Sequence, residues 1–553
     1  MKFLLKTAYK SAGQTYFLSG EGESVQDSRV KIQLENNNGI ITGDIIPKEE
    51  IEITEFSVSF KRPMEKDERI FSNGYQSWTL SREYAPDDKI RDFLFGADWL
   101  MNSVFMEKTG VNRAGDAIFI KTPHKRGIFT SSSYGYIRKG ETVEIYGSLS
   151  ERTGFTFLEF DGINGTITIK KDLVGVKFSE KRRVLDLAVI KDTYNAAFDK
   201  YFELMGVTCR QKERLCGYTT WYNYYGNITE DIVRRDLKAL SDFGERVDIF
   251  QIDDGYQAAI GDWLITDKKK FPSGMKAVAE AIHSNNMKAG LWLAPFGAVK
   301  SSRIFNEHPD WMVRDENGEP YVAGANWGKF YALDIYNEGA REYIRHFFDV
   351  VLNDWGYDMV KLDFLYAACM LPLHNKTRGE IMCDAMDLIR ECCGEKLVLG
   401  CGVPLMPAFG KVDFCRIGAD AGLDWRRHLY INREAVSTCH TVNNSIFRRH
   451  LDGRAFMNDP DVFLLRKSNM HMSFKQKKLL AKVNGLFGSL LFTSDNVGEY
   501  GADQEKVYRE TMSMPEREII SAEYTDKEEI TVKYIVSGEN KTLVFNPETG
   551  EER

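Results

Sequence analysis

The segment DMVKLD at residues 358–363 has the pattern of a short buried strand that ends in a carboxylate. Its apolar residues alternate with Lys361 and Asp363, which stand two positions apart and therefore point to the same side of an extended chain. If this strand belongs to a parallel barrel, both charged side chains lie at the barrel mouth, where such folds carry their functional groups.

The chain around this segment, from about residue 210 to 513, alternates short apolar runs with longer helical patterns. That rhythm is typical of a parallel sheet with helical crossovers, and eight candidate strands is the number of a (β/α)8 TIM barrel. Helices are expected at 229–243 and 338–355, each followed by a glycine that can cap it. The candidate strands are LCGYTTW (215–221), VDIFQID (247–253), KAGLWLAP (288–295), DMVKLD (358–363), KLVLGC (396–401), VDFCRIG (412–418), GRAFMN (453–458) and GSLLFTS (488–494).

The flanking regions have a different pattern. Residues 1–192 contain alternating or β-branched runs such as VKIQL and TITIKK, broken by turn signals, which predicts an N-terminal antiparallel β-sandwich. Residues 193–209 read as a connector helix, 210–513 as the barrel, and 514–553 as a small C-terminal antiparallel β-domain. We therefore expect a multidomain α/β protein.

Composition narrows the class of protein. The 553 residues carry a formal charge of -8 without a basic run, which disfavours nucleic acid or an anionic membrane as partner. No stretch approaches the ~20 apolar residues needed to cross a bilayer. The N-terminus lacks the apolar core of a signal peptide, and nine cysteines without a CxxC pair fit reduced thiols. These features predict a cytoplasmic location.

Acidic residues follow most of the predicted strands. One acid in this place would be explained as a cap of the next helix, but acids at five of eight strand ends favour a carboxylate-lined cup. The nine histidines fall away from the strand ends, so no transition-metal site is expected, and no cofactor is predicted. An oxygen-only Mg²⁺ site stays open as an alternative. The acids are Asp253, Asp254, Asp363, Asp420, Asp459 and Asp495.

Two carboxyl groups suffice for glycoside hydrolysis, one as nucleophile and one as acid and then base. Asp363 suits the first task, because an ammonium group from Lys361 beside it would hold it ionised. Asp420 suits the second, because the apolar residues around it would limit its solvation and favour the protonated form. Four indoles near strand ends offer flat faces to a sugar ring, although burial alone explains many tryptophans. They are Trp221, Trp263, Trp292 and Trp425.

The motifs together resemble those of glycoside hydrolase family 36, the α-galactosidases of clan D. The resemblance covers nearly the whole chain. The matching segments are WYNYYGNITE (221–230), IDDGYQ (252–257) with GDW (261–263), KAGLWLAP (288–295), HPDW (308–311), VKLDF (360–364), Cys401-Gly402 and RIGAD (416–420) with Trp425.

This resemblance implies a retaining, exo-acting enzyme that needs no cofactor and acts on oligosaccharides of the melibiose or raffinose type. It implies Asp363 as nucleophile and Asp420 as acid and base. Asp253 and Asp254 would pair the O4 and O6 hydroxyls of galactose. The remaining residues expected to line the sugar site are Lys361, Trp221, Trp263, Trp292, Cys401, Arg416, Trp425 and Trp78.

The chain departs from the family pattern at two places. Many members carry CSGG after strand five, where this chain has Cys401-Gly402-Val403-Pro404, so α-N-acetylgalactosaminidase stays an alternative. Many carry an arginine in the stretch that here reads NWGKFYALD, where Trp327 or Lys329 would take its place.

Other readings also stay open. Within the family, a galactosyl-transferring oligosaccharide synthase would use the same residues, and a homo-oligomer is compatible with the resemblance. A non-catalytic sugar-binding protein is disfavoured by the presence of both Asp363 and Asp420. In the N-terminal region, SNGYQSWTLS (72–81) is expected either to bring Tyr75 and Trp78 to the barrel mouth or to form an ordinary hairpin with buried aromatic residues.

Overall fold

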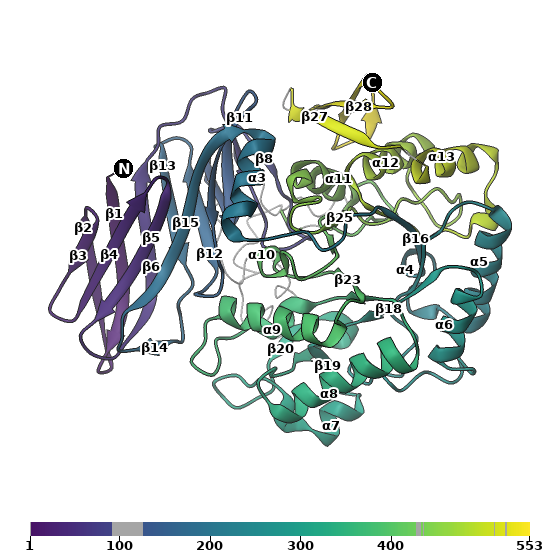
Figure 1. The fold of residues 1–553 in the computed structure, drawn as a ribbon, viewed down its shortest axis with the longest axis horizontal. Coiled ribbons are helices and arrows are strands. Elements are labelled where there is room, and N and C mark those ends of the chain that lie inside the picture. Colours follow the sequence, from purple (N-terminus) through teal and green to yellow (C-terminus); the bar gives the residue numbers. More distant parts are fainter. Residues whose placement is uncertain (1, 91–124, 427–432, 435, 514, 526–527) are drawn as a thin grey trace.

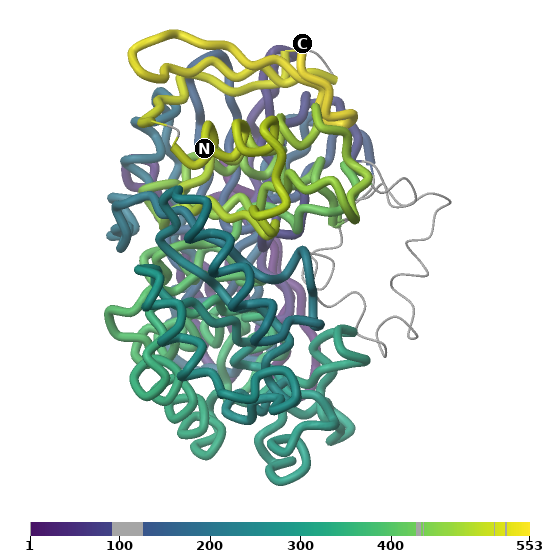
Figure 2. The backbone as a smooth tube through the Cα atoms, turned by 90° about the vertical axis from the view of Figure 1, so that its right-hand side faces the viewer, coloured from purple at the N-terminus to yellow at the C-terminus, as the bar shows by residue number. Residues whose placement is uncertain are grey.

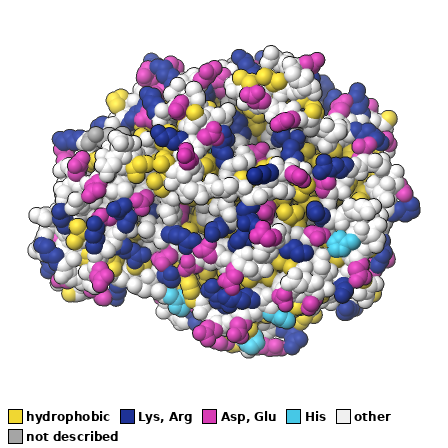
Figure 3. Space-filling model, in the orientation of Figure 1, with side chains coloured by type: hydrophobic (Ala, Val, Ile, Leu, Met, Phe, Trp, Pro, Cys, Tyr) yellow, Lys and Arg dark blue, Asp and Glu magenta, His cyan; other side chains and the backbone are white. Residues whose placement is uncertain are grey.

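The computed structural model describes residues 2–90, 125–426, 433–434, 436–513, 515–525 and 528–553. Figure 1 shows paired sheets at the N-terminal side, a ring of strands and helices beside them, and a small sheet near the C-terminus. On the face seen in Figure 3, basic and acidic side chains are interspersed, in keeping with a sequence that has no basic run.

The central sheet is a nearly closed barrel of eight parallel strands, as predicted. Their order is β25-β24-β23-β22-β18-β17-β16-β26, and a hydrogen bond from the Ser489 N–H to the Asn458 carbonyl (2.8 Å) joins the two ends. Nearly every strand residue is buried, because helices cover the outside of a parallel barrel and side chains fill its inside. The strands are β16 (Leu215–Thr219), β17 (Ile249–Ile252), β18 (Lys288–Leu293), β22 (Met359–Leu362), β23 (Leu397–Gly400), β24 (Phe414–Arg416), β25 (Met457–Asp459) and β26 (Leu490–Thr493).

Helix α5 begins and ends at the residues that the sequence marks. The Thr229 side chain caps α5 by accepting from the Ile232 N–H, and Gly244 ends the helix in the left-handed conformation (φ 74°). The longer helices are α5 (Glu230–Phe243), α6 (Met275–His283), α8 (Glu338–Asp349), α9 (Arg378–Cys393), α11 (Thr438–Phe447), α12 (Phe474–Phe487) and α13 (Ala502–Met512); the short ones are α4 (Trp221–Tyr224), α7 (Arg303–Glu307) and α10 (Leu405–Ala408).

Three boundaries differ from the prediction. Strand β16 ends at Thr219, so Trp221 begins the short helix α4 rather than ending a strand. The seventh strand begins at Met457, because the residues before it form a turn at Gly453 (φ 72°). The helix predicted at 338–355 is α-helical only to Asp349 and continues as a π-turn over Val350–Asp354, a local widening that apolar periodicity does not reveal.

The N-terminal region forms two antiparallel sheets with an apolar core between them. In β4 and β6 buried and less buried residues alternate, the period expected of strands with one face inside. The first sheet contains β1 (Phe3–Ser11), β2 (Gln14–Glu21), β6 (Ile51–Lys61), β9 (Ile128–Ser132), β12 (Thr156–Asp161), β13 (Thr166–Lys171) and β14 (Lys177–Phe178). The second contains β3 (Ser24–Gln26), β4 (Val30–Asn37), β5 (Ile40–Pro47), β7 (Arg69–Ser72), β8 (Arg82–Tyr84), β10 (Tyr134–Lys139), β11 (Thr142–Ser148) and β15 (Arg182–Thr193).

Two smaller units complete the fold. Helix α3 (Tyr194–Met205) leads from the sandwich to the barrel and ends at Gly206. The C-terminal sheet lies beside α12 and α13 (Figure 2), where the Arg517 side chain donates to the Leu486 and Gly488 carbonyls. Its strands are β27 (Arg517–Tyr524), β28 (Ile530–Val536), β29 (Glu539–Asn546) and β30 (Glu551–Glu552); a three-stranded sheet of β19 (Gly297–Val299), β20 (Val322–Gly324) and β21 (Phe330–Ala332) is inserted after β18.

Arg448, just after α11, fastens the sandwich to the barrel. Its fully buried guanidinium donates to the carbonyls of Gly74 (3.1 Å) and Gln76 (2.9 Å) in the β7–β8 loop and to the carbonyl of Ile417 (2.8 Å) in the barrel. The Asn444 amide donates to the Ser77 carbonyl in the same loop. Because the peptide groups of the loop find their partners on the barrel, the loop has a fixed position there.

Candidate active site

A buried ion pair lies at the mouth of the barrel. Lys361 of β22 donates to an Oδ2 atom of Asp253, at the end of β17, over 2.7 Å, and both side chains are less than a tenth exposed. Burial by itself lowers the pKa of Lys361, but the charges of Asp253, Cys401 and Asp363 raise it above its usual value. The partner predicted for Lys361 was Asp363; the direct partner is Asp253 instead, and Lys361 acts on Asp363 only through its field.

Asp363 follows β22 and is held by groups from three segments. The Trp292 indole N–H donates to its Oδ2 (3.3 Å), the Phe364 N–H donates to its Oδ1 (2.8 Å), and its own N–H donates to the Leu293 carbonyl. Burial raises the pKa of Asp363, Lys361 lowers it, and the charge of Asp420 raises it. The Asp363 carboxyl is therefore buried and held in one orientation, and its pKa depends on the charge of Asp420.

The Cys401-Gly402 pair after β23 packs directly against Asp363. Gly402 has φ 52°, and a Cβ there would lie 3.1 Å from the Asp363 Oδ1 and 2.9 Å from the Phe364 nitrogen. Any larger residue would strain the backbone and crowd the carboxylate. The buried Cys401 thiol interacts with Asp363 and lowers the pKa of that carboxyl. The structure thus brings Cys401 to the predicted site.

Asp254 is held by a residue from the inserted sheet region. The Trp327 indole N–H donates to its Oδ2 (2.9 Å), and the Gln257 amide donates to its Oδ1 (2.5 Å). Burial raises the pKa of Asp254, while the hydrogen bonds from Gln257 and Trp327 lower it. Of the two residues that the sequence offered in place of the arginine, Trp327 makes this contact. It adopts the left-handed conformation (φ 53°), a strain that concentrates at functional sites.

Asp420 shares a guanidinium with a carboxylate that the sequence analysis did not single out. Arg416 donates to Asp420 (2.9 Å) and also lies 3.2 Å from Asp461. Asp461 accepts from the Tyr222 hydroxyl (2.5 Å) and the Ala421 N–H (2.7 Å) and is almost fully buried. Asp420 is 39% exposed, so the poorly solvated setting predicted for it is wrong: its immediate neighbour is a cation and its other side faces solvent.

The four predicted indoles have different places. Trp292 contacts Asp363, whereas Trp263 is fully buried behind it, edge to face at 5.8 Å. Trp221 is partly exposed at the start of α4 and packs on Tyr225. Trp425 does not face the other site residues; its indole N–H donates to the Pro547 carbonyl (2.8 Å) of the C-terminal sheet. The positions of these tryptophans in the sequence could not distinguish the indoles, because a residue near a strand end can point into the site or away from it.

The β7–β8 loop brings a residue of the sandwich to Asp363. The Trp78 ring packs on Phe364 at 5.5 Å, and a Cβ on Gly402 would lie 3.0 Å from it. Tyr75 has another role, since its buried ring packs on Phe155 and its hydroxyl lies 3.8 Å from the Cys369 sulfur. Both readings of the loop were partly correct: it is a hairpin loop with a buried aromatic residue, and it carries Trp78 to the barrel mouth.

The acids at the ends of strands seven and eight support the site. Asp495 is fully buried and accepts from Arg466 (2.9 Å), the Leu465 N–H and the Tyr500 hydroxyl. Asp459 accepts from the Asp461 N–H. Among the described residues no group of three or more His, Cys, Asp or Glu side chains has an arrangement suited to a metal ion. No helix in the described part of the chain is long and apolar enough to cross a bilayer.

Comparison with known proteins finds a matching family model and a shared fold. The melibiase family model matches residues 198–376. The solved α-galactosidase of Thermus thermophilus in complex with p-nitrophenyl α-D-galactopyranoside superimposes with a TM-score of 0.70 and 25% sequence identity, over 94% of this chain and 98% of that one. Part of the chain is therefore similar to the melibiase family, and the chain has the fold of the solved α-galactosidases. The melibiase match contains Asp253, Asp254 and Asp363.

The sequence relatives match over a shorter region. An A type blood α-D-galactosamine galactosaminidase of Flavonifractor plautii is 32% identical over 164 residues, and an α-galactosidase of Escherichia coli is 31% identical over 160 residues. Each match covers 28% of this chain, but only 15% and 22% of the respective relative. The chain therefore matches less than a quarter of the length of these two relatives.

Asp461→Asn tests the electrostatics of this end of the barrel. Burial raises the pKa of Asp461 to about 7, against about 3.9 in an unfolded chain. Between these values the native state binds more protons than the unfolded state, so this group's contribution to stability decreases as pH rises from about 4 to 7. Asparagine does not titrate, so the Tm of the variant relative to the parent should increase through this window.

Calorimetry from pH 4 to 8 measures this difference. Asp242→Asn, on the exposed side of α5, is the control and should follow the pH dependence of the parent. Parallel curves for Asp461→Asn and the parent would contradict the expectation.

Proposed function

We propose that the protein is a retaining, exo-acting α-galactosidase that hydrolyses terminal α-D-galactosyl residues of melibiose- or raffinose-type oligosaccharides. The arrangement around Asp363 supports this proposal most directly. Its carboxylate is oriented by Trp292 and by the Phe364 N–H, lies against Gly402, and senses the charge of Asp420. The fold is shared over 94% of the chain with an enzyme solved in complex with an aryl α-galactoside.

In the proposed reaction Asp363 attacks the anomeric carbon as Asp420 donates its proton to the glycosidic oxygen. The bond from carbon to Asp363 forms, the glycosidic bond breaks, and the aglycone leaves with the proton. Water then attacks the same carbon, Asp420 takes a proton from it, and the bond to Asp363 breaks to release galactose in the α configuration. The exposure of Asp420 gives it access to the aglycone side and to water, while Arg416 holds its position.

Selection of galactose is assigned to the carboxylates at the end of β17. Asp253 forms an ion pair with Lys361, and a carboxylate only accepts hydrogen bonds, so it requires a hydroxyl donor from the sugar. An epimer that places no hydroxyl there leaves a buried charge less well solvated, which is costly. Asp254, held by Trp327 and Gln257, would pair the neighbouring hydroxyl in the same way.

Two alternatives use the same groups. One relative acts on α-D-galactosamine units by its name, and this chain lacks the CSGG of many family members after β23, so an α-N-acetylgalactosaminidase is the second candidate. A galactosyl-transferring synthase would pass the sugar to another sugar instead of water. The cytoplasmic location and a homo-oligomeric state stay predictions.

A comparison of substrates separates these candidates. We expect kcat/KM for an aryl α-galactoside to exceed that for the matching α-N-acetylgalactosaminide by about 100-fold or more, because an acetamido group adds bulk near Cys401 and Gly402. Proton NMR of the first product should show α-galactose. Preference for the acetamido substrate, transfer products at low sugar concentration, or initial release of β-galactose would each contradict the proposal.

Azide rescue tests the roles of the two carboxyl groups. Asp363→Gly should lower kcat on an aryl α-galactoside by about 1000-fold or more. Azide should then enter from the vacated side and give β-galactosyl azide. In Asp420→Gly, azide should instead attack the covalent intermediate from the opposite side and give α-galactosyl azide. The same azide anomer from both variants, or unimpaired turnover in either, would show that the roles are misassigned.

Trp327→Phe removes the hydrogen bond to Asp254 but keeps an aromatic ring, and so tests the role of that bond. Loss of the indole N–H removes a hydrogen bond that lowers the pKa of Asp254, so this pKa should rise and the acidic limb of the kcat/KM profile should move to higher pH. KM should rise by about tenfold, the value expected for a lost hydrogen bond to a charged group. Lys329→Met is the matched control from the same loop. An unchanged acidic limb in Trp327→Phe would contradict the assignment.

A further inference from the structure

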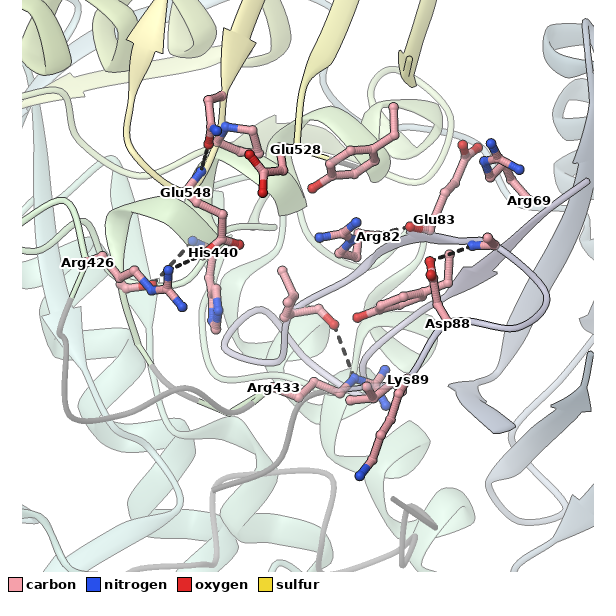
Figure 4. A pocket seen from close by; sticks show the side chains of 18 of the residues that line it. Arg69, Arg82, Glu83, Asp88, Lys89, Arg426, Arg433, His440, Glu528 and Glu548 are labelled. Carbon is pink, nitrogen blue, oxygen red and sulfur yellow. Dashed lines mark hydrogen bonds and ion pairs between the residues drawn. The ribbon is translucent and has the colours of Figure 1, made fainter. Parts of the chain in front are cut away.

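A cavity away from the candidate active site lies where the sandwich, the barrel and the C-terminal sheet meet. Its volume is about 600 Å³, within the range of pockets that bind small molecules. Neither Asp363 nor Asp420 lines it. Its walls come from β8 and the residues after it, from the start of α11, and from the C-terminal strands, as Figure 4 shows.

Arg82 lies in the middle of this cavity (Figure 4). Its guanidinium packs over the Tyr524 ring at 3.9 Å and the Tyr84 ring at 5.0 Å, and its Nε donates to the Glu83 carbonyl at 3.2 Å. Among the described residues no carboxylate forms an ion pair with it. Two aromatic faces fix the direction of the side chain, but they replace only part of the solvation that a charged group loses on burial.

Four acids line the cavity (Figure 4): Glu83, Asp88, Glu528 and Glu548. Glu83 pairs with Arg138 at 2.6 Å, and Glu548 pairs with Arg426 at 2.5 Å. Asp88 accepts from the Ala85 N–H. The wall also contains Arg433, whose guanidinium donates to the Leu80 carbonyl and to Thr130, and the exposed Lys89. Five basic side chains line the cavity, Arg69, Arg82, Lys89, Arg426 and Arg433, so its wall carries a small excess of positive charge.

We propose that this cavity binds a phosphate monoester of about the size of a hexose phosphate. Arginine is the side chain best suited to a tetrahedral oxyanion, because its planar group donates two parallel hydrogen bonds. The Tyr84 and Tyr524 rings, over which its guanidinium packs, hold Arg82 in place before binding, so little side-chain freedom is lost on binding. The volume exceeds that needed for a free oxyanion and leaves room for a sugar beside Ser437 and Asn546.

Calorimetry on the full chain with glucose 6-phosphate, inorganic phosphate and glucose tests this proposal without any measurement of turnover. Glucose 6-phosphate should bind saturably at one site, and glucose should not compete with it. Inorganic phosphate should bind more weakly; if it binds as tightly as the ester, the sugar part of the proposal is wrong. Absence of saturable binding by either anion would overturn the proposal as a whole.

Variants locate the binding. Arg82→Gln should weaken it by about tenfold or more, the loss expected when a charge-assisted bidentate contact is removed. Lys89→Gln, at the exposed rim, should weaken it less and keeps the test valid if Arg82→Gln does not fold. Arg303→Gln, exposed on α7, is the control for the change in charge. An equal loss in the control, or displacement of the anion by excess galactose, would place the binding elsewhere and overturn the proposal.

Discussion

The ion pair between Lys361 and Asp253 determines the electrostatics of the barrel mouth. Around it stand further carboxyl groups, two of which, Asp420 and Asp461, contact the buried guanidinium of Arg416. Negative charge therefore exceeds positive charge in a place with little water, and burial raises the pKa of Asp254, Asp363 and Asp461. If Lys361 were absent, Asp253 would lose its ionic partner and the pKa of Asp363 would lie higher still. This one ammonium group is therefore the charge that most opposes the rise in the pKa of Asp363.

Much of the fold followed from pattern alone. The eight barrel strands, the capped helix α5 and the C-terminal strands lie where periodicity and glycine positions placed them, because burial on both faces of a strand and a left-handed cap leave direct traces in the sequence. The π-turn after α8 left no such trace, since its apolar residues still fit a helical period. The boundary of the seventh strand was misplaced for a similar reason, because Ala455 and Phe456 are apolar but lie before the strand.

The site was predictable as a set of strand ends but not as a set of partners. Strand position placed Asp363, Asp253 and Asp254 correctly, whereas same-side spacing made Lys361 a partner of Asp363 when β17, two strands away in the barrel, offered Asp253. Asp461 was missed, although its NDPD context (458–461) follows a predicted strand and was a usable signal. The contact of Trp327 with Asp254 depends on a left-handed residue in a loop, and no sequence period reports such a conformation.

Because of Arg448, the structure of the barrel depends on the sandwich. Its guanidinium satisfies carbonyls of both the β7–β8 loop and the barrel, and the same loop places Trp78 against Phe364 beside Asp363. A barrel cut free of the sandwich would keep every carboxylate of the site, yet it would lose one wall and expose a cation shaped to fit another surface. Recombination between relatives would therefore have to exchange the β7–β8 loop and helix α11 together, because each supplies the hydrogen-bond partners of the other.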